Sequence, residues 1–395
     1  MLTKEFSMVE LEEAIKEMKT NTALGPDGWF VELRRDILEM LNKLHEGNLD
    51  LARLNYGVIT LIPKVKGATN IKQFRPICLL NVIYKIITKV LTIRLTKVAD
   101  SVISENQTAF IPGRNILDGV VIVHEVIHHL KKQKKAGIVL KLDFEKAYDK
   151  VDWTFLEEMD CLGEKAVEGG RVSVNLNGQR GEFFRSYKGL RQGDPLSPML
   201  FNLIGDALSE ILKTAREKGV LNGLVPDLIE GGLTHLQYAD NMILFLENTE
   251  REIRNMKFLL FCYEEMSGMR INYAKSEVFT VGMGDGECDE IAKVFNCKKG
   301  VFPIKYLGIP IRDRRLSKEE LSEPVRKVEK RLETWKCSQL SYGGKAVLIN
   351  SSLTSIPMYM MGFYLLHEGT HQQMDSIRGR FFWQGVGKKK KIPYG

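Results

Sequence analysis

The stretch Leu236-Gln237-Tyr238-Ala239-Asp240-Asn241-Met242-Ile243-Leu244-Phe245 places a carboxylate at the crest of a tight turn between two apolar runs. This pattern predicts a strand, a turn and a second strand. Upstream, residues 138–144 form another apolar strand that delivers a carboxylate, Asp143. A buried strand tolerates an unpaired Asp at its end only where something compensates the charge. Two carboxylates that converge suit Mg²⁺, and the pattern therefore predicts the core of a two-metal phosphoryl-transfer site.

Composition sets the outer limits of this interpretation. The chain has 395 residues, 57 Lys and Arg against 50 Asp and Glu, and a net charge of +7. This moderate basic excess is compatible with a polyanionic partner. The six cysteines show no paired C-x-x-C spacing, which argues against a zinc knuckle or a disulfide framework. No apolar run is long enough for a bilayer span. We expect a soluble protein without membrane contact, inside the cell, in nucleus or cytoplasm; its oligomeric state is left open.

Periodicity predicts helices and strands along most of the chain. Helices are expected at 7–19, 31–46, 81–99, 115–135, 199–218 and 249–267, and strands at 56–64, 276–281 and 306–311, with a hairpin at 171–184 around Asn177 and Gly178. A Gly- and Pro-rich loop at 189–198 leads into the helix from Met199. The region from Ser317 onward is helical and basic, which suggests a separate lobe.

Asp143 and Asp240 lie nearly a hundred positions apart, and each alone is a weak signal, because an Asp after a strand is usually a turn or cap residue. The order of several motifs is more informative. These are Leu61–Lys64, Phe74–Ile77, Asp143–Val151, Gly189–Pro198, Tyr238–Asn241, Asn272–Glu277, Tyr306–Gly308, Trp335, Leu340–Lys345 and Ile356–Pro357. Read in this order, they closely resemble the reverse transcriptase of plant LINE-type non-LTR retrotransposons over almost the whole chain.

The resemblance implies an α+β right-hand polymerase with fingers, a ferredoxin-like palm and a helical thumb. We expect an N-terminal helical extension at 1–50, fingers and palm at 51–314, and a thumb-like region at 315–395. It implies an RNA-directed DNA polymerase that uses an RNA template, a DNA primer and dNTPs, with two Mg²⁺ ions that Mn²⁺ can replace.

The resemblance also assigns expected roles to single residues, each named here at its own position. Asp143 and Asp240 would be the metal ligands, with Asn241 beside them and Lys275 as a proton donor to pyrophosphate. Substrate binding would fall to Lys64, Arg75, Tyr148, Gln192 and Gly193, and the primer grip to Tyr306, Leu307 and Gly308. Each has an ordinary structural alternative: a core aromatic for Tyr148, a helix-entry turn for Gln192 and Gly193, and solvated surface charges for the three cations. The Lys388–Lys391 run is either a frayed tail or a phosphate-binding patch.

A competing motif occurs at 124–128, where His124-Glu125-Val126-Ile127-His128 satisfies the H-E-x-x-H pattern of zinc proteases. A third ligand is not evident in the sequence. The apolar residues Val120, Val123, Ile127 and Leu130 form an ordinary buried stripe. We therefore do not expect a protease.

The turn motif departs from the family at Asn241, where the family carries a second Asp. An amide oxygen can still coordinate Mg²⁺, but it brings no negative charge, so polymerisation slowed by orders of magnitude is expected. The chain also looks shortened between Trp153 and Arg171 and after Gly28, and we see neither the endonuclease nor a zinc-binding or RNase H segment. These features predict a degenerate or truncated copy, and the alternative is a catalytically dead nucleic-acid-binding remnant.

Overall fold

The computed structural model describes residues 4–18, 29–158, 170–312, 314, 316–317, 319–333 and 340–384. The stretch between Trp153 and Arg171 that the sequence predicts to be shortened falls largely outside these residues, as do Trp335 and Lys388–Lys391, whereas the stretch after Gly28 is described and forms a helix, Trp29–His45. The chain divides into two compact units. The first comprises Met1–Gly119 with Gln133–Gly300, and the second Val120–Lys132 with Val301–Gly395. The domain boundaries expected at 50 and 314 stay a prediction.

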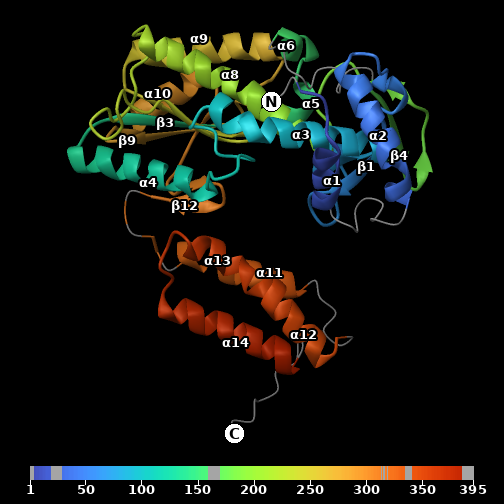
Figure 1. The fold of residues 1–395 in the computed structure, drawn as a ribbon. Coiled ribbons are helices and arrows are strands. Elements are labelled where there is room, and N and C mark those ends of the chain that lie inside the picture. Colours follow the sequence, from blue (N-terminus) through green and yellow to red (C-terminus); the bar gives the residue numbers. More distant parts are fainter. Residues whose placement is uncertain are drawn as a thin grey trace. The chain divides into compact units, whose positions relative to one another are not determined.

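A five-stranded sheet with the order β10-β9-β3-β8-β7 forms the centre of the first unit. Strand β3 is central because Ile138, Val139 and Leu140 leave almost no surface exposed, so both of its faces are covered. Helices α8, α9 and α10 lie on one face of the sheet (Figure 1). The elements are β3 (Gly137–Leu142), β7 (His235–Tyr238), β8 (Asn241–Leu246), β9 (Glu277–Val281), β10 (Lys298–Lys299), α8 (Ser197–Glu217), α9 (Glu250–Ser267) and α10 (Asp285–Phe295).

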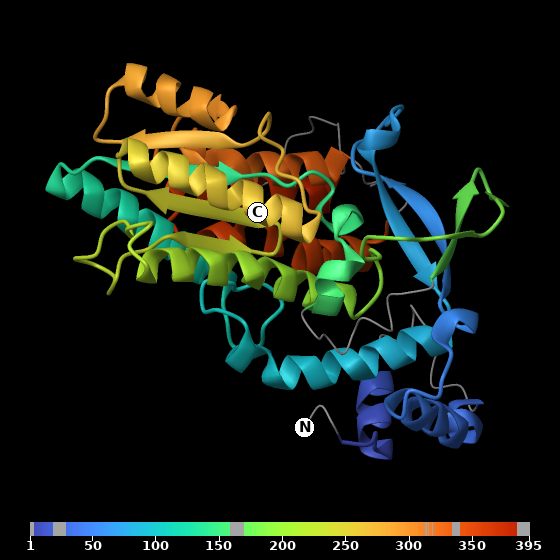
Figure 2. The same ribbon diagram turned by 90° about the horizontal axis from the view of Figure 1, so that it is seen from above.

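A second sheet of the same unit has the order β2-β1-β4-β5, with β6 also paired to β4. Its hairpin turns at Asn177 and Gly178, whose φ angles of 52° and 84° fit the mirror-image turn that this residue pair favours. The hairpin is drawn in green in Figure 2. The strands are β1 (Tyr56–Pro63), β2 (Phe74–Leu80), β4 (Arg171–Leu176), β5 (Gln179–Arg180) and β6 (Phe184–Arg185).

The first N-terminal helix packs on α3 through one buried arginine. Helix α1 begins at a capping box in which Ser7 and Glu10 bond each other's backbone, the arrangement that a Ser followed three positions later by a Glu favours. Arg94 of α3 is 3% exposed and donates to both carboxylate oxygens of Glu10, at 2.7 and 2.9 Å. These hydrogen bonds lower the pKa of Glu10 to about 2. The helices are α1 (Met8–Glu17), α2 (Trp29–His45) and α3 (Val82–Val102).

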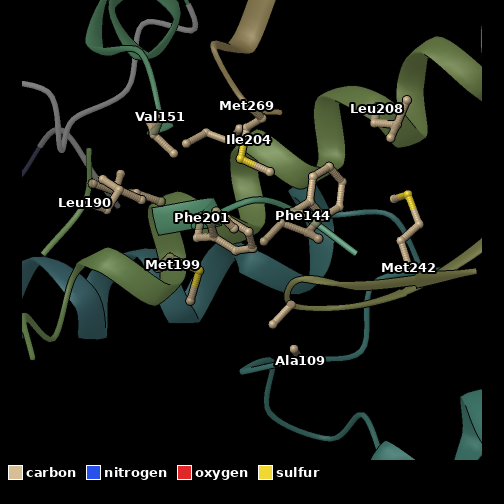
Figure 3. Packing of buried hydrophobic residues seen from close by; sticks show 14 of the residues in the cluster. Ala109, Phe144, Val151, Leu190, Met199, Phe201, Ile204, Leu208, Met242 and Met269 are labelled. Atoms are coloured by element: carbon tan, nitrogen blue, oxygen red, sulfur yellow. The ribbon is translucent and has the colours of Figure 1, made fainter. Parts of the chain in front are cut away.

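One apolar core runs through the first unit. Figure 3 shows part of it, where Phe144 and Met242 from the central sheet pack with Phe201, Ile204 and Leu208 of α8. The short helices α5 (Ala147–Lys150) and α6 (Trp153–Glu158) join this core through Val151 and Trp153. The segment after β3 is thereby fixed to the same core that holds β8.

The second unit is mainly helical, as expected for the C-terminal part. It contains most of α4 (Ile116–Gln133), then α11 (Glu323–Glu333), α12 (Tyr342–Leu348), α13 (Ser355–Met361) and α14 (Glu368–Gln384). The prediction of a single strand at 306–311 in the main sheet is wrong. The segment is instead a separate hairpin of β11 (Ile304–Tyr306) and β12 (Ile309–Ile311), because Leu307 and Gly308 turn with φ of 48° and 85°. The sequence interpretation also missed α10.

Candidate active site at the ends of β3 and β8

The register of the central sheet brings the two acidic motifs together. Strands β3 and β8 are antiparallel, and Leu142 pairs with Met242. The next residue of each strand end is therefore Asp143 on one side and Asn241 on the other, with Asp240 in the turn between β7 and β8. Residues nearly a hundred positions apart thus share one edge of one sheet.

The turn that carries Asp240 is strained and is held by two glutamines. Ala239 has a φ of 51°, a left-handed conformation that residues other than Gly, Asn and Asp seldom adopt. Its N–H donates to Oε1 of Gln107 at 3.1 Å, and its carbonyl accepts from Nε2 of Gln237 at 3.0 Å. Gln237 lies against Gly205 of α8, where an added Cβ would come 2.2 Å from Nε2. The core helix thereby fixes the position of the turn.

The carboxyl group of Asp240 lies near a second carboxyl group, that of Asp143. Its side chain reaches solvent, yet the atoms packed around the turn, and then the nearby charge of Asp143, raise its pKa. Asn241 Nδ2 donates to Asp240 Oδ1 at 3.3 Å, so the amide contributes a dipole but no charge. Two carboxylates at one sheet edge disfavour each other's charged form, and a divalent cation held between them would compensate both charges.

Asp143 is positioned mainly through its backbone. Its N–H donates to the buried Ser276 Oγ at 3.1 Å, and its carbonyl accepts from the N–H of Asn272 at 2.7 Å. The Ser276 hydroxyl donates in turn to the carbonyl of Asn272 at 3.0 Å. Lys275, in the same loop, brings Nζ to 3.9 Å from Asp143 Oδ1. The loop before β9 therefore supplies both the anchor of Asp143 and a cation beside it.

Tyr148 lies between the acidic turn and the core. Its ring stacks on Phe201 of α8 with centroids 4.7 Å apart and planes at 7°. Burial, and then the charge of Asp240, raise the pKa of Tyr148 to about 12. Its carbonyl accepts from the N–H of Leu190 at 2.6 Å, which joins it to the loop at 189–198. The ordinary alternative, a core aromatic, explains the ring face that packs on Phe201. It does not explain the other face, because the side chain is only half-buried.

That loop also contacts the second sheet at a residue that only glycine fits. The carbonyl of Gln192 accepts from the N–H of Cys78 at 2.8 Å. Gly193 has a φ of 112°, and an added Cβ would come 2.7 Å from the Cys78 carbonyl oxygen. Backbone of the loop and of β2 therefore approach each other closely.

The two cations expected to bind substrate lie on the second sheet. Lys64 follows β1. Burial raises the pKa of Asp149, the neighbour of Tyr148, and the positive charge of Lys64 partly opposes this rise. Arg75 lies on β2, opposite Ile62, and is exposed. Tyr306, Leu307 and Gly308 belong to the second unit, in which the Tyr359 hydroxyl donates to the carbonyl of Leu307 at 2.9 Å.

Sequence reasoning missed the residues that hold the site together. Ser276 stands inside the quoted 272–277 motif, and Gln237 is a polar residue in a buried strand directly before Tyr238, so both left a signal. Gln107 and Gly205 have no such signal in the sequence, because the residues they contact are distant along the chain. In the H-E-x-x-H segment, the rings of His124 and His128 stack 6.5 Å apart, and the described part of the chain contains no group of three or more His, Cys, Asp or Glu side chains suited to a metal.

The fold and this edge of the sheet are those of a template-directed polymerase. Residues 62–311 match the reverse transcriptase (RNA-dependent DNA polymerase) family, and the chain belongs to that family. The prediction of an α+β reverse transcriptase fold is confirmed. Its similarity is to reverse transcriptase domains of non-LTR retrotransposons of the R2 and TX1 kind.

Three relatives define this similarity. The transposon TX1 uncharacterized 149 kDa protein of Xenopus laevis is 29% identical over 382 residues, covering 89% of this chain and 28% of that protein. The Pol polyprotein of the retrotransposable element R2DM of Drosophila melanogaster is 26% identical, covering 70% of this chain and 26% of that protein. An uncharacterized mitochondrial protein of Arabidopsis thaliana is 39% identical over 66 residues, covering 17% of this chain and 54% of that protein. The chain spans about a quarter of the first two.

None of the helices that the structure describes is both long and apolar enough to cross a bilayer.

Proposed function

We propose that this chain is the polymerase part of a retrotransposon protein and transfers deoxynucleotides from dNTPs to a primer 3′-hydroxyl on an RNA template. The observation that carries the proposal is the meeting of Asp143 and Asp240 at one sheet edge, where burial, and then the charge of Asp143, raise the pKa of Asp240. The donor set consists of hard oxygens, which suit divalent cations such as Mg²⁺ and Mn²⁺.

Asp143 and Asp240 would hold two Mg²⁺ ions, with the amide oxygen of Asn241 as a neutral further ligand. When bound, such ions activate the attacking hydroxyl and stabilise the charge of the leaving group. The chain's own part is to fix the two carboxylates, which the glutamine-held turn and the Ser276 anchor do. Lys275 lies close enough to Asp143 to stay at the site and to donate a proton to pyrophosphate.

The remaining residues would bind the substrates. Lys64 and Arg75 are exposed cations suited to the oxygens of a triphosphate. The open face of the Tyr148 ring would exclude a ribose 2′-hydroxyl, because stacking on Phe201 leaves the ring no room to retreat. Gln192 and Gly193 would place template and nucleotide, and Tyr306, Leu307 and Gly308 would grip the primer.

Asn241 sets the expected rate. One missing charge at ~4 Å and an effective dielectric of about 20 corresponds to about 4 kcal/mol, and each ~1.4 kcal/mol is tenfold in rate. After screening by solvent, we expect Asn241→Asp to raise single-nucleotide incorporation by about 10- to 1000-fold. Purified wild type and variant are compared on a primed RNA template with Mg²⁺.

A matched control adds the same charge elsewhere. Asn248→Asp changes an exposed amide beyond the far end of β8 and should leave incorporation unchanged. Asp240→Asn should abolish incorporation in both backgrounds. If Asn241→Asp incorporates no nucleotide, the proposal of a surviving polymerase is wrong.

Asn241 also favours a second candidate, a nucleic-acid-binding remnant without turnover. Such a protein would bind an RNA–DNA hybrid with strong salt dependence and would not extend it, even as Asn241→Asp. Absence of binding at low salt would exclude this candidate.

The finer origin is also a proposal. We infer a plant LINE-type element, supported by the ordered motifs and by the Arabidopsis thaliana relative.

A further inference from the structure

Aromatic and arginine side chains gather on one surface of the second sheet, away from the acidic turn. We name this surface the hairpin face. Its members, all exposed, are Tyr56, Arg171, Arg180, Phe183, Arg185 and Tyr187. Tyr187 is the most open of the aromatic residues, at 78%. Figure 2 shows the green hairpin that carries five of the six.

The strand register places three of these residues in one row. Tyr56 of β1 pairs with Arg171 of β4, and Arg171 pairs with Arg185 of β6. Directly opposite residues of neighbouring strands project from the same face. Phe183 meets the Tyr56 ring edge-on with centroids 6.1 Å apart. The row is therefore an aromatic ring followed by two cations.

Two arginines lie over faces of these rings. The guanidinium carbon of Arg180 lies 5.2 Å from the centroid of Phe183, and that of Arg185 lies 5.8 Å from the centroid of Tyr187. These pairs leave most of the Tyr187 ring open to solvent. Such interleaving of open rings and cations is the composition of surfaces that bind single-stranded nucleic acid, where bases stack and phosphates meet arginine.

The pairing of Arg171 with Arg185 points independently to an anion. Like charges directly opposite each other across two strands destabilise a sheet. Within the described part of the chain, neither arginine has a carboxylate within ion-pair distance. A phosphate bound between the two arginines would attract both and so compensate their mutual repulsion. An apolar protein partner would leave the repulsion uncompensated.

The hairpin face is continuous in the chain with the candidate active site. Two residues after Tyr187, Gly189 donates its N–H to the carbonyl of Val151, and Leu190 donates to that of Tyr148. The segment that leaves the hairpin face thus enters the site directly. A strand bound on this face can therefore be the same strand that is copied at the site.

We propose that the hairpin face binds the unpaired part of the RNA template, with a base stacked on Tyr187 and backbone phosphates on Arg171 and Arg185. A duplex is a poorer occupant, because its base faces are already stacked and cannot reach the ring. The proposal rests on the proposed polymerase function for the identity of the strand as template, and its test does not require incorporation.

The test measures binding by fluorescence anisotropy, without dNTPs, to two labelled probes of equal length. One is an oligouridine of about 12 nucleotides, within the ~4–16 that single-strand-binding folds cover, and the other is a blunt RNA–DNA hybrid. Tyr187→Ala should weaken oligouridine binding by between about 5- and 150-fold, the range for one lost base–ring stack, and leave hybrid binding within about twofold. The matched control is Phe258→Ala on α9, another largely open aromatic at 64% exposure, which should change neither affinity.

A second pair of variants tests the charges. Arg185→Gln should reduce the slope of log affinity against log salt for oligouridine by about 0.7, one phosphate contact on a single strand. Arg254→Gln removes the same charge from an exposed α9 residue paired with Glu250 and should leave that slope unchanged. Without RNA, Arg185→Gln should also raise the midpoint of thermal unfolding, since it removes the like-charge pair.

Three outcomes would overturn the proposal. The first is a wild-type protein that does not bind oligouridine. The second is a Tyr187→Ala variant that loses affinity equally for oligouridine and for the hybrid. The third is a Tyr187→Ala variant whose affinity for oligouridine changes no more than that of Phe258→Ala. Failure of nucleotide incorporation with binding intact would overturn the polymerase proposal and leave the hairpin face supported.

Discussion

Replacement of Gly193 by alanine tests the contact between the 189–198 loop and β2. The φ of 112° at this residue lies outside the range that L-residues populate, which costs about 1–3 kcal/mol. The added Cβ would also stand 2.7 Å from the carbonyl oxygen of Cys78, a backbone atom that cannot rotate away. Moving either segment lengthens the Cys78–Gln192 hydrogen bond, which contributes about 0.5–1.5 kcal/mol. We expect Gly193→Ala to lower the free energy of unfolding by about 2–4 kcal/mol.

Gly67 provides the matched control. It has a φ of 74° in the loop between β1 and β2, and an added Cβ there has no heavy atom within 4 Å. Gly67→Ala should therefore cost only the left-handed backbone strain of about 1–2 kcal/mol. Urea unfolding followed by tryptophan fluorescence gives both values, and single-nucleotide incorporation reports on the site. Equal losses of stability in the two variants, within ~0.5 kcal/mol, would refute the close approach of loop and strand.

Three further predictions concern the anchors of the fold and site. Ser276→Ala removes a buried hydroxyl that bonds the backbone after β3 and should cost about 1–3 kcal/mol in urea unfolding, against less than ~0.5 for the exposed Ser101→Ala. Asp240→Asn should raise the midpoint of thermal unfolding at neutral pH in chelator. The pKa of Asp240 is higher in the folded state than its ordinary value of 3.8, so the charged Asp240 side chain destabilises the fold above the folded-state pKa. This destabilisation disappears as the pH falls below 3.8. A lower midpoint for Asp240→Asn than for the wild type, in chelator at pH 7, would contradict this. Arg94→Met should cost about 3–5 kcal/mol by leaving a carboxylate unpaired, whereas Arg34→Met, which breaks an exposed pair at 3.6 Å, should cost no more than ~1 in the same urea series.

The local elements were predictable wherever neighbouring residues determine them. The capping box at Ser7, the Asn177-Gly178 hairpin and the turn at Asp240 follow from short-range backbone chemistry, and the structure contains all three. The single strand expected at 306–311 failed because a positive φ at Leu307 has no sequence signal, while an apolar run fits a strand or a hairpin equally well.

The candidate site was predictable only in its acidic residues. Apolar runs ending in Asp143 and Asp240 mark two strand ends, but no local pattern specifies that those strands are neighbours. The residues that support the site were harder still to predict. Gln107 contacts Ala239 and Gly205 contacts Gln237, and these contacts exist only in the folded chain. The roles of the substrate-binding residues and of the primer grip stay predictions.

The central position of β3 has a consequence for incomplete copies of such a gene. Its two partners, β8 and β9, are encoded about a hundred or more codons downstream, so β3 emerges from the ribosome long before either can pair with it. A reading frame interrupted after Leu142 and before Val281 would therefore release a chain in which β3 has an open edge, and such edges promote aggregation. Nonsense mutations between codons 143 and 281 should therefore yield insoluble protein, whereas interruptions after Gly300 leave the whole of the first unit encoded.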